Sequence, residues 1–519
     1  MRVPSLRLFL GAILIAFAAA ATAALPPGVT EGATVEGITE YRLDNGLTVL
    51  LFPDATQAKT TVSITYLVGS RMENYGETGM AHLLEHMNFK GTPTEGNLMT
   101  ALGKRGMAFN ATTSYDRTNY FETFPKSEDN LEFALAMEAD RMVNSKIARV
   151  DLDTEMPVVR NEMESGENDP VRILIQRTIS VAYDWHNYGK ETIGARSDVE
   201  GVDIGRLQAF YHLYYQPDNA VLLVAGAFDP EKTLALIAKD FGPLPKPTRV
   251  LPRLYTEEPV PDGEREVTLR RVGDTQWLSA LYHTVPAATP DSVAIEAAVG
   301  IMTLTPGGRL YKALVETHKA SAVDDYVFNG RDPGFAMFLV QVPDQDPLAP
   351  ARKAMVETIQ GVPAHPVTEA ELARIRNKRL KEIDETINNP QRLGISLSEA
   401  IARGDWRLFF LRRDWWRAVT TRDVDRVAAA YFKSTNLTVG AFVPDAKPDR
   451  SPVPPVADVS SLVKDYKGDA AVAEGEQFDA TIANLDARTQ RFALANGMRV
   501  PRRRAARRCR SRCDSTTAT

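Results

Sequence analysis

The chain has 519 residues, of which 44% are hydrophobic and 25% charged, proportions that are ordinary for a globular protein. Its length exceeds the roughly 250–300 residues at which a single hydrophobic core stops growing, so several domains are expected. The formal net charge of −6 argues against binding to nucleic acid or to an anionic membrane surface.

The first 23 residues have the pattern of a secretory signal peptide. Arg2 and Arg7 form a basic start, residues 8–21 are an apolar run, and Ala21-Thr22-Ala23 is a small-x-small cleavage site. A retained membrane anchor is the alternative, but the run is shorter than the roughly 20 residues that a span requires. No later stretch approaches that length. We therefore expect an exported protein, periplasmic or secreted, without a stable membrane span.

The region 24–246 alternates strand and helix patterns, as an α+β unit does. Asn45-Gly46 between two apolar runs indicates a hairpin turn, and alternating branched residues indicate a strand over 61–68. Apolar residues at helical spacing and one short buried run predict the other elements: helices over 80–89, 130–143, 151–164 and 230–240, and a strand over 221–225.

The helix predicted over 80–89 carries the most informative pattern, His82-Leu83-Leu84-Glu85-His86. Histidines at positions i and i+4 project from one helical face about one turn apart, so both imidazoles can reach a single ion. Glu85 lies on the same side, where it can contact a metal-bound water. This is the inverted zincin arrangement, in which the carboxylate is the general base. The alternative is a pair of surface histidines, but only seven histidines occur in the chain, so the motif predicts one Zn2+ per chain.

A catalytic zinc site needs a third protein ligand and keeps its fourth position for water. No other histidine lies nearby in the sequence, so the candidates are carboxylates on the helix predicted over 151–164. Glu155 and Glu162 are seven residues apart, which places them two turns apart on one helical face. Glu164 and Glu167 are rivals that also fit a solvated acidic helix end.

The His82-x-x-Glu85-His86 motif followed by Glu162, 76 positions after His86, resembles the pitrilysin/insulinase family of zinc metallopeptidases. The resemblance implies that Glu162 is the third ligand and that Glu155 orients the site without binding the metal. The likeness covers about 400 residues, 39–444, and includes further motifs: Gly69-Ser70-Arg71-Met72-Glu73, Glu77-Thr78-Gly79, Tyr215-Gln216-Pro217-Asp218-Asn219 and Phe241-Gly242-Pro243-Leu244-Pro245.

The segment Asn110-Ala111-Thr112-Thr113, followed by Thr118-Asn119-Tyr120, is similar to the edge strand with which the family pairs the substrate backbone. An extended peptide can add to an open sheet edge through main-chain hydrogen bonds. The resemblance implies that Asn110 and Ala111 bind substrate, with Asn110 donating near the scissile carbonyl. The alternative for Asn110 is a turn residue at the start of a strand.

Residues 247–446 repeat the order of elements of the first region without a metal motif. Strands are predicted over 266–272, 277–283, 335–342 and 437–443, helices over 291–302 and 369–387, the latter with a capping box of Thr368 and Glu371. We therefore expect an α+β fold with two homologous α/β sandwich-like units, 24–246 with zinc and 247–446 without it. In the long members of the family, two such units form half of a clamshell.

The end of the chain begins a second copy of its start. A Pro-rich, polar stretch predicts a linker over 447–480, after which Phe492 to Val500 repeats the hairpin pattern of Tyr41 to Val49. Residues 481–500 are then the start of a truncated second half, and the predicted strand stops at Pro501. Residues 501–519 are a basic, non-homologous tail that contains both cysteines, Cys509 and Cys513.

Three interpretations of this tail are open. It can be an arm that binds nucleic acid or membrane, a metal or disulfide site built on its two cysteines, or the product of a shifted reading frame. The first would begin inside a hairpin, and the second lacks partner residues in the chain. The frameshift is favoured because the arginine-rich residues follow no pattern.

The resemblance implies an Arg and a Tyr, seven residues apart, that hold substrate and stabilise the oxyanion opposite the zinc. In the second unit Val315 and Ala322 stand at these positions, and in four-unit members the pair comes from the fourth unit. The expected function is a zinc metalloendopeptidase acting on extended peptides or unfolded proteins through a metal-activated water. The competing hypothesis is a catalytically silent or partner-dependent half that serves as a binding subunit. Its partner would be a second-half subunit or another copy of the chain.

Overall fold

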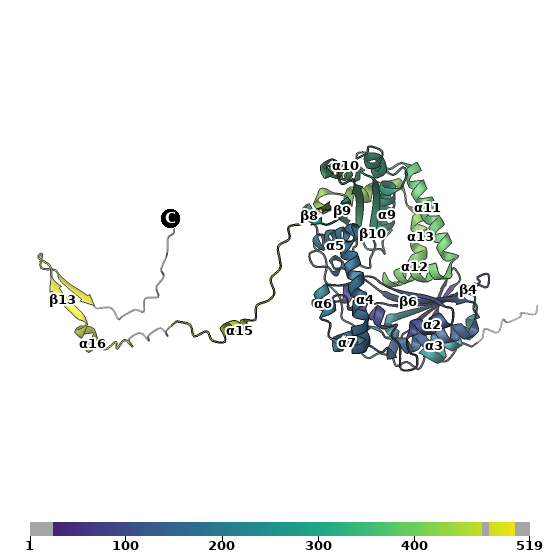
Figure 1. Ribbon diagram of the computed structural model, residues 1–519, viewed down its shortest axis with the longest axis horizontal. Helices are drawn as coiled ribbons and strands as arrows, with labels where there is room; N and C mark the ends of the chain where they lie inside the picture. The colour runs from purple at the N-terminus through teal and green to yellow at the C-terminus, as the bar shows by residue number, and fades with distance from the viewer. Residues whose placement is uncertain (1–23, 470–476, 504–519) are drawn as a thin grey trace, which may run out of the picture. The chain divides into compact units, whose positions relative to one another are not determined.

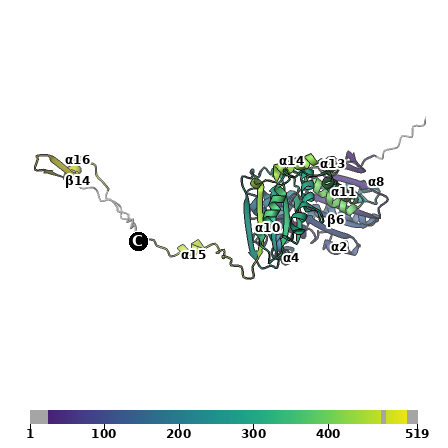
Figure 2. The same ribbon diagram turned by 90° about the horizontal axis from the view of Figure 1, so that it is seen from above.

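The computed structural model describes residues 24–469 and 477–503, so the expected signal peptide and the tail from residue 504 lie outside the described residues. The chain forms two compact units that divide between Pro448 and Asp449. The larger unit contains two β-sheets with their helices. Figure 1 and Figure 2 show its purple and blue first half beside its teal and green second half.

The first sheet has seven strands in the order β1-β2-β3-β7-β4-β6-β5, with β3 and β7 parallel and β5 at the edge. Because helices cover both of its faces, the central strands β4 and β7 are buried along almost their whole length. The strands are β1 (Val29–Val35), β2 (Ile38–Leu43), β3 (Thr48–Pro53), β4 (Lys59–Tyr66), β5 (Ala108–Thr113), β6 (Thr118–Pro125) and β7 (Ala220–Gly226).

The helices of this first half follow the sequence patterns closely. They are α1 (Met80–Met87), α2 (Leu98–Lys104), α3 (Glu128–Asn144), α4 (Arg149–Asn168), α5 (Pro170–Ala182), α6 (Arg196–Glu200), α7 (Ile204–Tyr214) and α8 (Pro230–Phe241). Several helix ends differ from the predicted bounds by one to four residues, as α1 and α4 show. α1 ends at Met87 and not at Phe89, because the chain turns at Gly91, where φ is 111°. α4 continues four residues beyond Glu164, to Asn168.

The second sheet repeats five strands of the first. Its order, β10-β11-β9-β12-β8, matches β5-β6-β4-β7-β3, and the parallel pair β8/β12 matches β3/β7. This confirms the predicted fold class of two homologous α/β units. The elements are β8 (Arg265–Arg271), β9 (Gln276–His283), α9 (Pro290–Thr303), β10 (Ala322–Phe328), β11 (Phe335–Val342), α10 (Leu348–Gln360), α11 (Glu369–Ile387), α12 (Pro390–Ala402), α13 (Leu408–Ala418), α14 (Thr421–Tyr431) and β12 (Leu437–Pro444).

The two halves of the larger unit exchange helices. α12 belongs to the second half by sequence, but it packs on β4, β6 and β7 of the first sheet, where Leu393 and Leu397 bury against Leu223. In return α5 packs on β8, β9 and β12, where Leu174 contacts Phe442. Each sheet therefore completes its core with a helix from the other half, which fixes the two sheets relative to each other.

The smaller unit contains α15 (Val459–Val463), α16 (Ile482–Ala487) and a hairpin of β13 (Thr489–Ala493) and β14 (Arg499–Arg503). The predicted turn at Asn496-Gly497 is present, but β14 continues through Pro501, where the sequence pattern predicts its end. In a two-stranded sheet both outer edges are open, so Pro501 can lack an N–H without leaving a partner unpaired. Leu494 and Met498 are half exposed, whereas their counterparts in the first copy are buried.

Candidate metal centre

The helix that carries the histidines is held at its N-terminus by a buried carboxylate. Glu73, 2% exposed, accepts hydrogen bonds from the backbone N–H groups of Gly79 and Ala81, both at 2.8 Å. Burial raises the pKa of Glu73 to about 8, and these two donors oppose that shift. Gly79 has a φ of 91° and a Cβ there would lie 2.6 Å from the carbonyl oxygen of Ile193, so this position requires glycine. The start of α1 is therefore fixed.

The structure brings His82, His86 and Glu162 together. The imidazoles of α1 lie 4.8 Å apart between ring centroids, and α4 places Glu162 opposite them. Glu162 Oε2 lies 3.6 Å from Nε2 of His82 and 3.6 Å from Nε2 of His86. In the part of the chain that the structure describes, this is the one group of three or more His, Cys, Asp or Glu side chains suited to hold a metal ion.

Glu155 supports the arrangement from the side of His86 that faces away from Glu162. Its carboxylate oxygen Oε1 lies 2.8 Å from Nδ1 of His86, which leaves Nε2 of that ring facing Glu162. The other oxygen forms an ion pair with Lys90. Although burial opposes ionisation, the hydrogen bonds from Lys90 and His86 lower the pKa of Glu155. This contact is of the kind by which carboxylates orient metal-binding histidines.

The protonation states of His82 and Glu162 suit metal binding, whereas His86 has to lose a proton first. Burial lowers the pKa of His82 to about 4, and the neighbouring His86 adds to the effect. The contact with His86 lowers the pKa of Glu162, although burial acts against it. A neutral imidazole and an ionised carboxylate are the forms that coordinate a metal. Although burial acts against it, the hydrogen bonds to Glu162 and Glu155 raise the pKa of His86, so this ring releases a proton when it coordinates.

Glu85 is held by the edge strand of the sheet. Its Oε2 accepts a hydrogen bond of 2.5 Å from the hydroxyl of Thr113, the last residue of β5. Burial raises the pKa of Glu85, and the Thr113 hydrogen bond opposes that rise. A carboxylate with a raised pKa is suited to accept and return a proton near neutral pH.

The two rival carboxylates point elsewhere. Glu164 and Glu167 both contact Arg196, at 3.2 and 3.7 Å, and their side chains are about half exposed. They form a solvated acidic end of α4, as the alternative interpretation of the sequence has it.

The predicted substrate strand lies where an additional strand could join. β5 pairs only with β6 and forms the edge of the sheet, and its end contacts the catalytic candidate Glu85 through Thr113. The side chain of Asn110 is exposed, and Ala111 is 5% exposed. An open edge beside a metal centre can hold an extended peptide.

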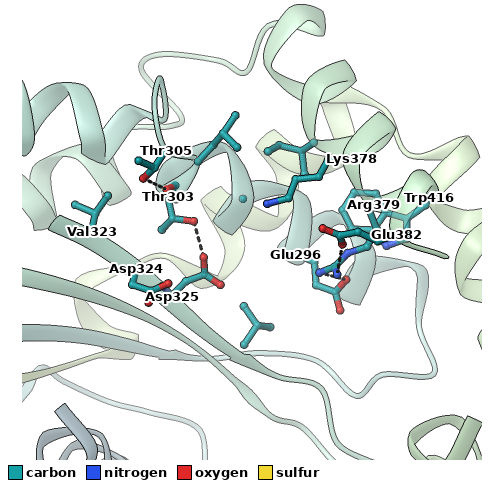
Figure 3. Close-up of a pocket in the computed structure, with 14 residues that line it drawn as sticks. Glu296, Thr303, Thr305, Val323, Asp324, Asp325, Lys378, Arg379, Glu382 and Trp416 are labelled. Carbon is teal, nitrogen blue, oxygen red and sulfur yellow. Dashed lines mark hydrogen bonds and ion pairs between the residues drawn. The ribbon is translucent and has the colours of Figure 1, made fainter. Parts of the chain in front are cut away.

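The second half has a polar cavity at the position that corresponds to the cluster of His82, His86 and Glu162 in the first half. α9 follows β9 as α1 follows β4, and a cavity of about 450 Å³ lies between α9, β10 and α11 (Figure 3). Glu296 of α9 lies 3.8 Å from Arg379 of α11, and Thr303 donates to Asp325 at 2.6 Å. None of the residues that line the cavity is a histidine, so the duplicated position lacks the imidazole ligands.

No sequence pattern indicates a role for Glu73, Lys90 or Thr113 at this site. Glu73 and Thr113 lie inside the motifs already singled out, which is a signal for their importance but not for their contacts. Lys90 follows the metal helix closely, and nothing in its sequence context indicates a pairing with Glu155, 65 positions later. Among the described residues, no helix is both long and apolar enough to span a bilayer.

Comparisons with known proteins identify a family for this chain. A model named "Insulinase (Peptidase family M16)" matches residues 48–196, and one named "Peptidase M16 inactive domain" matches residues 201–379. The zinc protease PqqE of Helicobacter pylori is 28% identical over 404 residues, which cover 76% of this chain and 90% of that protein.

Two solved structures share the fold. The crystal structure of a protease from Helicobacter pylori has a TM-score of 0.75 at 26% identity and covers 78% of this chain and 99% of that one. The first half of the periplasmic protease PqqL from Escherichia coli has a TM-score of 0.64 at 20% identity, covering 80% of this chain and 94% of that one. Because the two family models adjoin and span most of the larger unit, the chain belongs to the insulinase, or M16, family of peptidases.

Proposed function

We propose that this chain is a zinc metalloendopeptidase that hydrolyses peptide bonds of extended peptides or unfolded proteins. The observation that carries the proposal is the position of Glu162 Oε2, 3.6 Å from Nε2 of both His82 and His86. Two imidazole nitrogens and one carboxylate oxygen are the ligands of a catalytic zinc site with a fourth position left open. The membership of the peptidase family supports the same assignment.

The residues present fit a zinc ion. Both Nε2 atoms face Glu162, and Glu155 engages the far nitrogen of His86 at 2.8 Å. Zinc, when bound, supplies a Lewis acid that polarises the peptide carbonyl and lowers the pKa of a water molecule. Glu85 would accept a proton from the attacking water and later return it to the leaving amine, the role of a general base and then acid.

The substrate class follows from the edge strand. An extended backbone pairs with β5, with Asn110 and Ala111 beside the scissile bond, and it can do so only where the substrate has no competing structure. Folded proteins present few such segments, so peptides and unfolded chains are the proposed substrates.

The domain limits are also part of the proposal. Residues 24–246 and 247–446 are the two units, 447–480 a linker, and 481–500 the start of a further half whose tail diverges over 501–519. The half-exposed Leu494 and Met498 in the second hairpin support this, since their counterparts in the first copy lie in a core. A partner that supplies the further half would then complete the enzyme. Until it binds, the chain alone would cleave peptides slowly; the alternative is a catalytically silent half that serves as a binding subunit.

Export is proposed from the signal-peptide pattern, and it is supported by the likeness to PqqL of Escherichia coli, which is a periplasmic protease. The mature chain then begins at about Ala24, directly after Ala21-Thr22-Ala23. N-terminal sequencing of the protein from the periplasm or culture medium measures this start. An exported, soluble protein that still begins at Met1 would rule out cleavage of the signal peptide.

The purified chain is expected to bind about one zinc ion, the stoichiometry of a single three-ligand site. Elemental analysis of the wild type and of His82→Ala measures this directly. His82→Ala removes one of three ligands and should abolish retention of the metal on dialysis. His283→Ala is the matched control, because His283 contacts the carbonyl oxygen of Ala182 at 2.9 Å, away from the cluster. Equal zinc in wild type and His82→Ala would contradict the assignment.

A further inference from the structure

Residues of the second half contact the turn between β5 and β6 of the first half. This turn directly follows Thr113, which contacts Glu85, the proposed general base. Thr113 ends β5 and donates its hydroxyl to Glu85 at 2.5 Å. Four residues later, Arg117 lies in the turn directly before β6 and is almost fully buried. The contacts of Arg117 extend to both halves of the larger unit.

On one side Arg117 fixes the end of β5. Its Nη1 donates to the carbonyl oxygen of Thr112 at 2.8 Å and to the side-chain oxygen of Asn119 at 2.7 Å. Thr112 in turn donates its own hydroxyl to Asn119 at 2.6 Å. Because Thr112 precedes Thr113, these bonds set where the Thr113 hydroxyl lies relative to Glu85.

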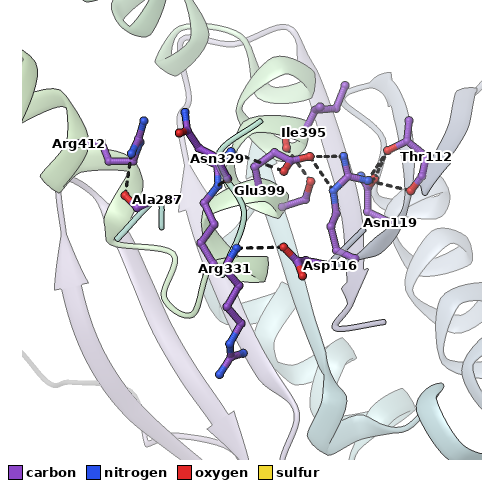
Figure 4. Close-up of polar contacts among 12 residues, drawn as sticks. Thr112, Asp116, Asn119, Ala287, Asn329, Arg331, Ile395, Glu399 and Arg412 are labelled. Carbon is purple, nitrogen blue, oxygen red and sulfur yellow. Dashed lines mark hydrogen bonds and ion pairs between the residues drawn. The ribbon is translucent and has the colours of Figure 1, made fainter. Parts of the chain in front are cut away.

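On the other side Arg117 is bound by α12 of the second half. Its Nε lies 3.0 Å from Oε1 of Glu399, and Nη2 contacts the same oxygen at 2.5 Å (Figure 4). A charged donor pair on one carboxylate is stronger than neutral hydrogen bonds, and here the Arg117 side chain is buried while that of Glu399 is 30% exposed. Helix α12 belongs to the second half by sequence but packs on the first sheet, so the position of α12 depends on the cores of both halves.

The neighbouring residue of the turn is held by a second element of the same half. Asp116 accepts a hydrogen bond of 3.0 Å from the backbone N–H of Arg331, in the connection between β10 and β11. It also accepts one from Tyr188 at 2.7 Å and pairs with Arg71 at 2.5 Å. Two adjacent turn residues are thus bound to two separate elements of the second half, shown together in Figure 4.

We propose that Thr113 is a positioning residue for Glu85 and that the second half sets its position through Glu399 and Arg117. This rests on the proposed role of Glu85 as the general base. The second half then has a role at the proposed active site of the first half. Helix α12 of the second half holds the end of β5 through Arg117, and the end of β5 positions Glu85 through Thr113. A displacement of α12 should therefore move the Glu85 carboxylate without changing the metal ligands.

Kinetics test the positioning. Thr113→Val keeps the shape of the side chain but removes the donor, and it should lower kcat about 10- to 100-fold with less than about a twofold change in KM and unchanged zinc. Thr113→Ser restores the hydroxyl and should recover most of the rate. The proposal would be overturned if Thr113→Val had the wild-type kcat, or if Thr113→Ser were as slow as Thr113→Val.

Crystal structures of both variants provide a second test that does not depend on catalytic activity. The Glu85 carboxylate should leave its site in Thr113→Val only, and an unmoved carboxylate would also overturn it.

Amide hydrogen exchange tests the connection to the second half, and it requires neither zinc nor hydrolysis. Glu399→Gln should speed exchange in residues 108–118 about tenfold, the effect of losing a bond to a charged group. Glu36→Gln is the matched control, because Glu36 pairs with Arg413 across the two halves without contacting β5. Equal exchange in both variants would overturn the connection. If the wild-type protein binds no zinc, that result would instead count against the proposed function.

Discussion

Replacing Glu85 by glutamine is expected to lower the rate of peptide hydrolysis about a hundred- to ten-thousandfold, the contribution of a positioned general base. Glutamine has the same shape but cannot accept the proton, and Glu85 is not among the three groups that converge on the proposed zinc. The variant should therefore retain its metal. The measurement is cleavage of an unstructured peptide in the form of the protein, alone or with a partner half, that cleaves fastest.

Glu164→Gln provides the control for this substitution. It removes the same charge from the neighbouring helix α4, but Glu164 contacts Arg196 and points away from the cluster. Its rate should equal that of the wild type. A Glu85→Gln protein that cleaves at the wild-type rate would show that another group is the base.

The chain alone is expected to hydrolyse peptides about a hundred- to a thousandfold more slowly than the chain joined to a further pair of units, the effect of one missing oxyanion donor. Val315 and Ala322 cannot donate side-chain hydrogen bonds to a developing oxyanion. The comparison is between the chain as it stands and a polypeptide that continues a second half after Val500, with the same peptide and the same zinc content.

Full activity from the chain alone, removed by a chelator and restored by zinc, would show that a second half is dispensable. The nucleotide sequence that follows the codon for Val500 gives an independent check. A reading frame that continues the repeated pattern beyond Phe492 to Val500 would support the partner-dependent form of the proposal.

The features that could be predicted from the sequence are those set by interactions between residues close together in the chain. The spacing of His82 and His86 requires only a helix, and α1 forms because apolar residues at helical spacing bury its other face. The Asn-Gly pairs specify both hairpins, and Thr368 with Glu371 forms the predicted capping box at the start of α11. These signals act over a few residues and depend little on the rest of the fold.

Contacts between distant segments could not be predicted in the same way. The pattern of α12 shows an apolar face, but it does not say which sheet that face covers, and α12 packs on the sheet of the other half. The same holds for Arg117, 282 residues from its partner Glu399. Such pairs are set by the packing of both cores, for which a single sequence offers no periodic signal.

The most direct test of the zinc site is X-ray absorption spectroscopy at the zinc edge on the purified chain. The arrangement of His82, His86 and Glu162 predicts two imidazole nitrogens at about 2.0–2.1 Å and oxygen ligands at about 2.0–2.2 Å, in a four-coordinate shell. His82→Ala should remove this signal. A shell of oxygens without imidazole, or an unchanged imidazole signal in His82→Ala, would contradict the assignment.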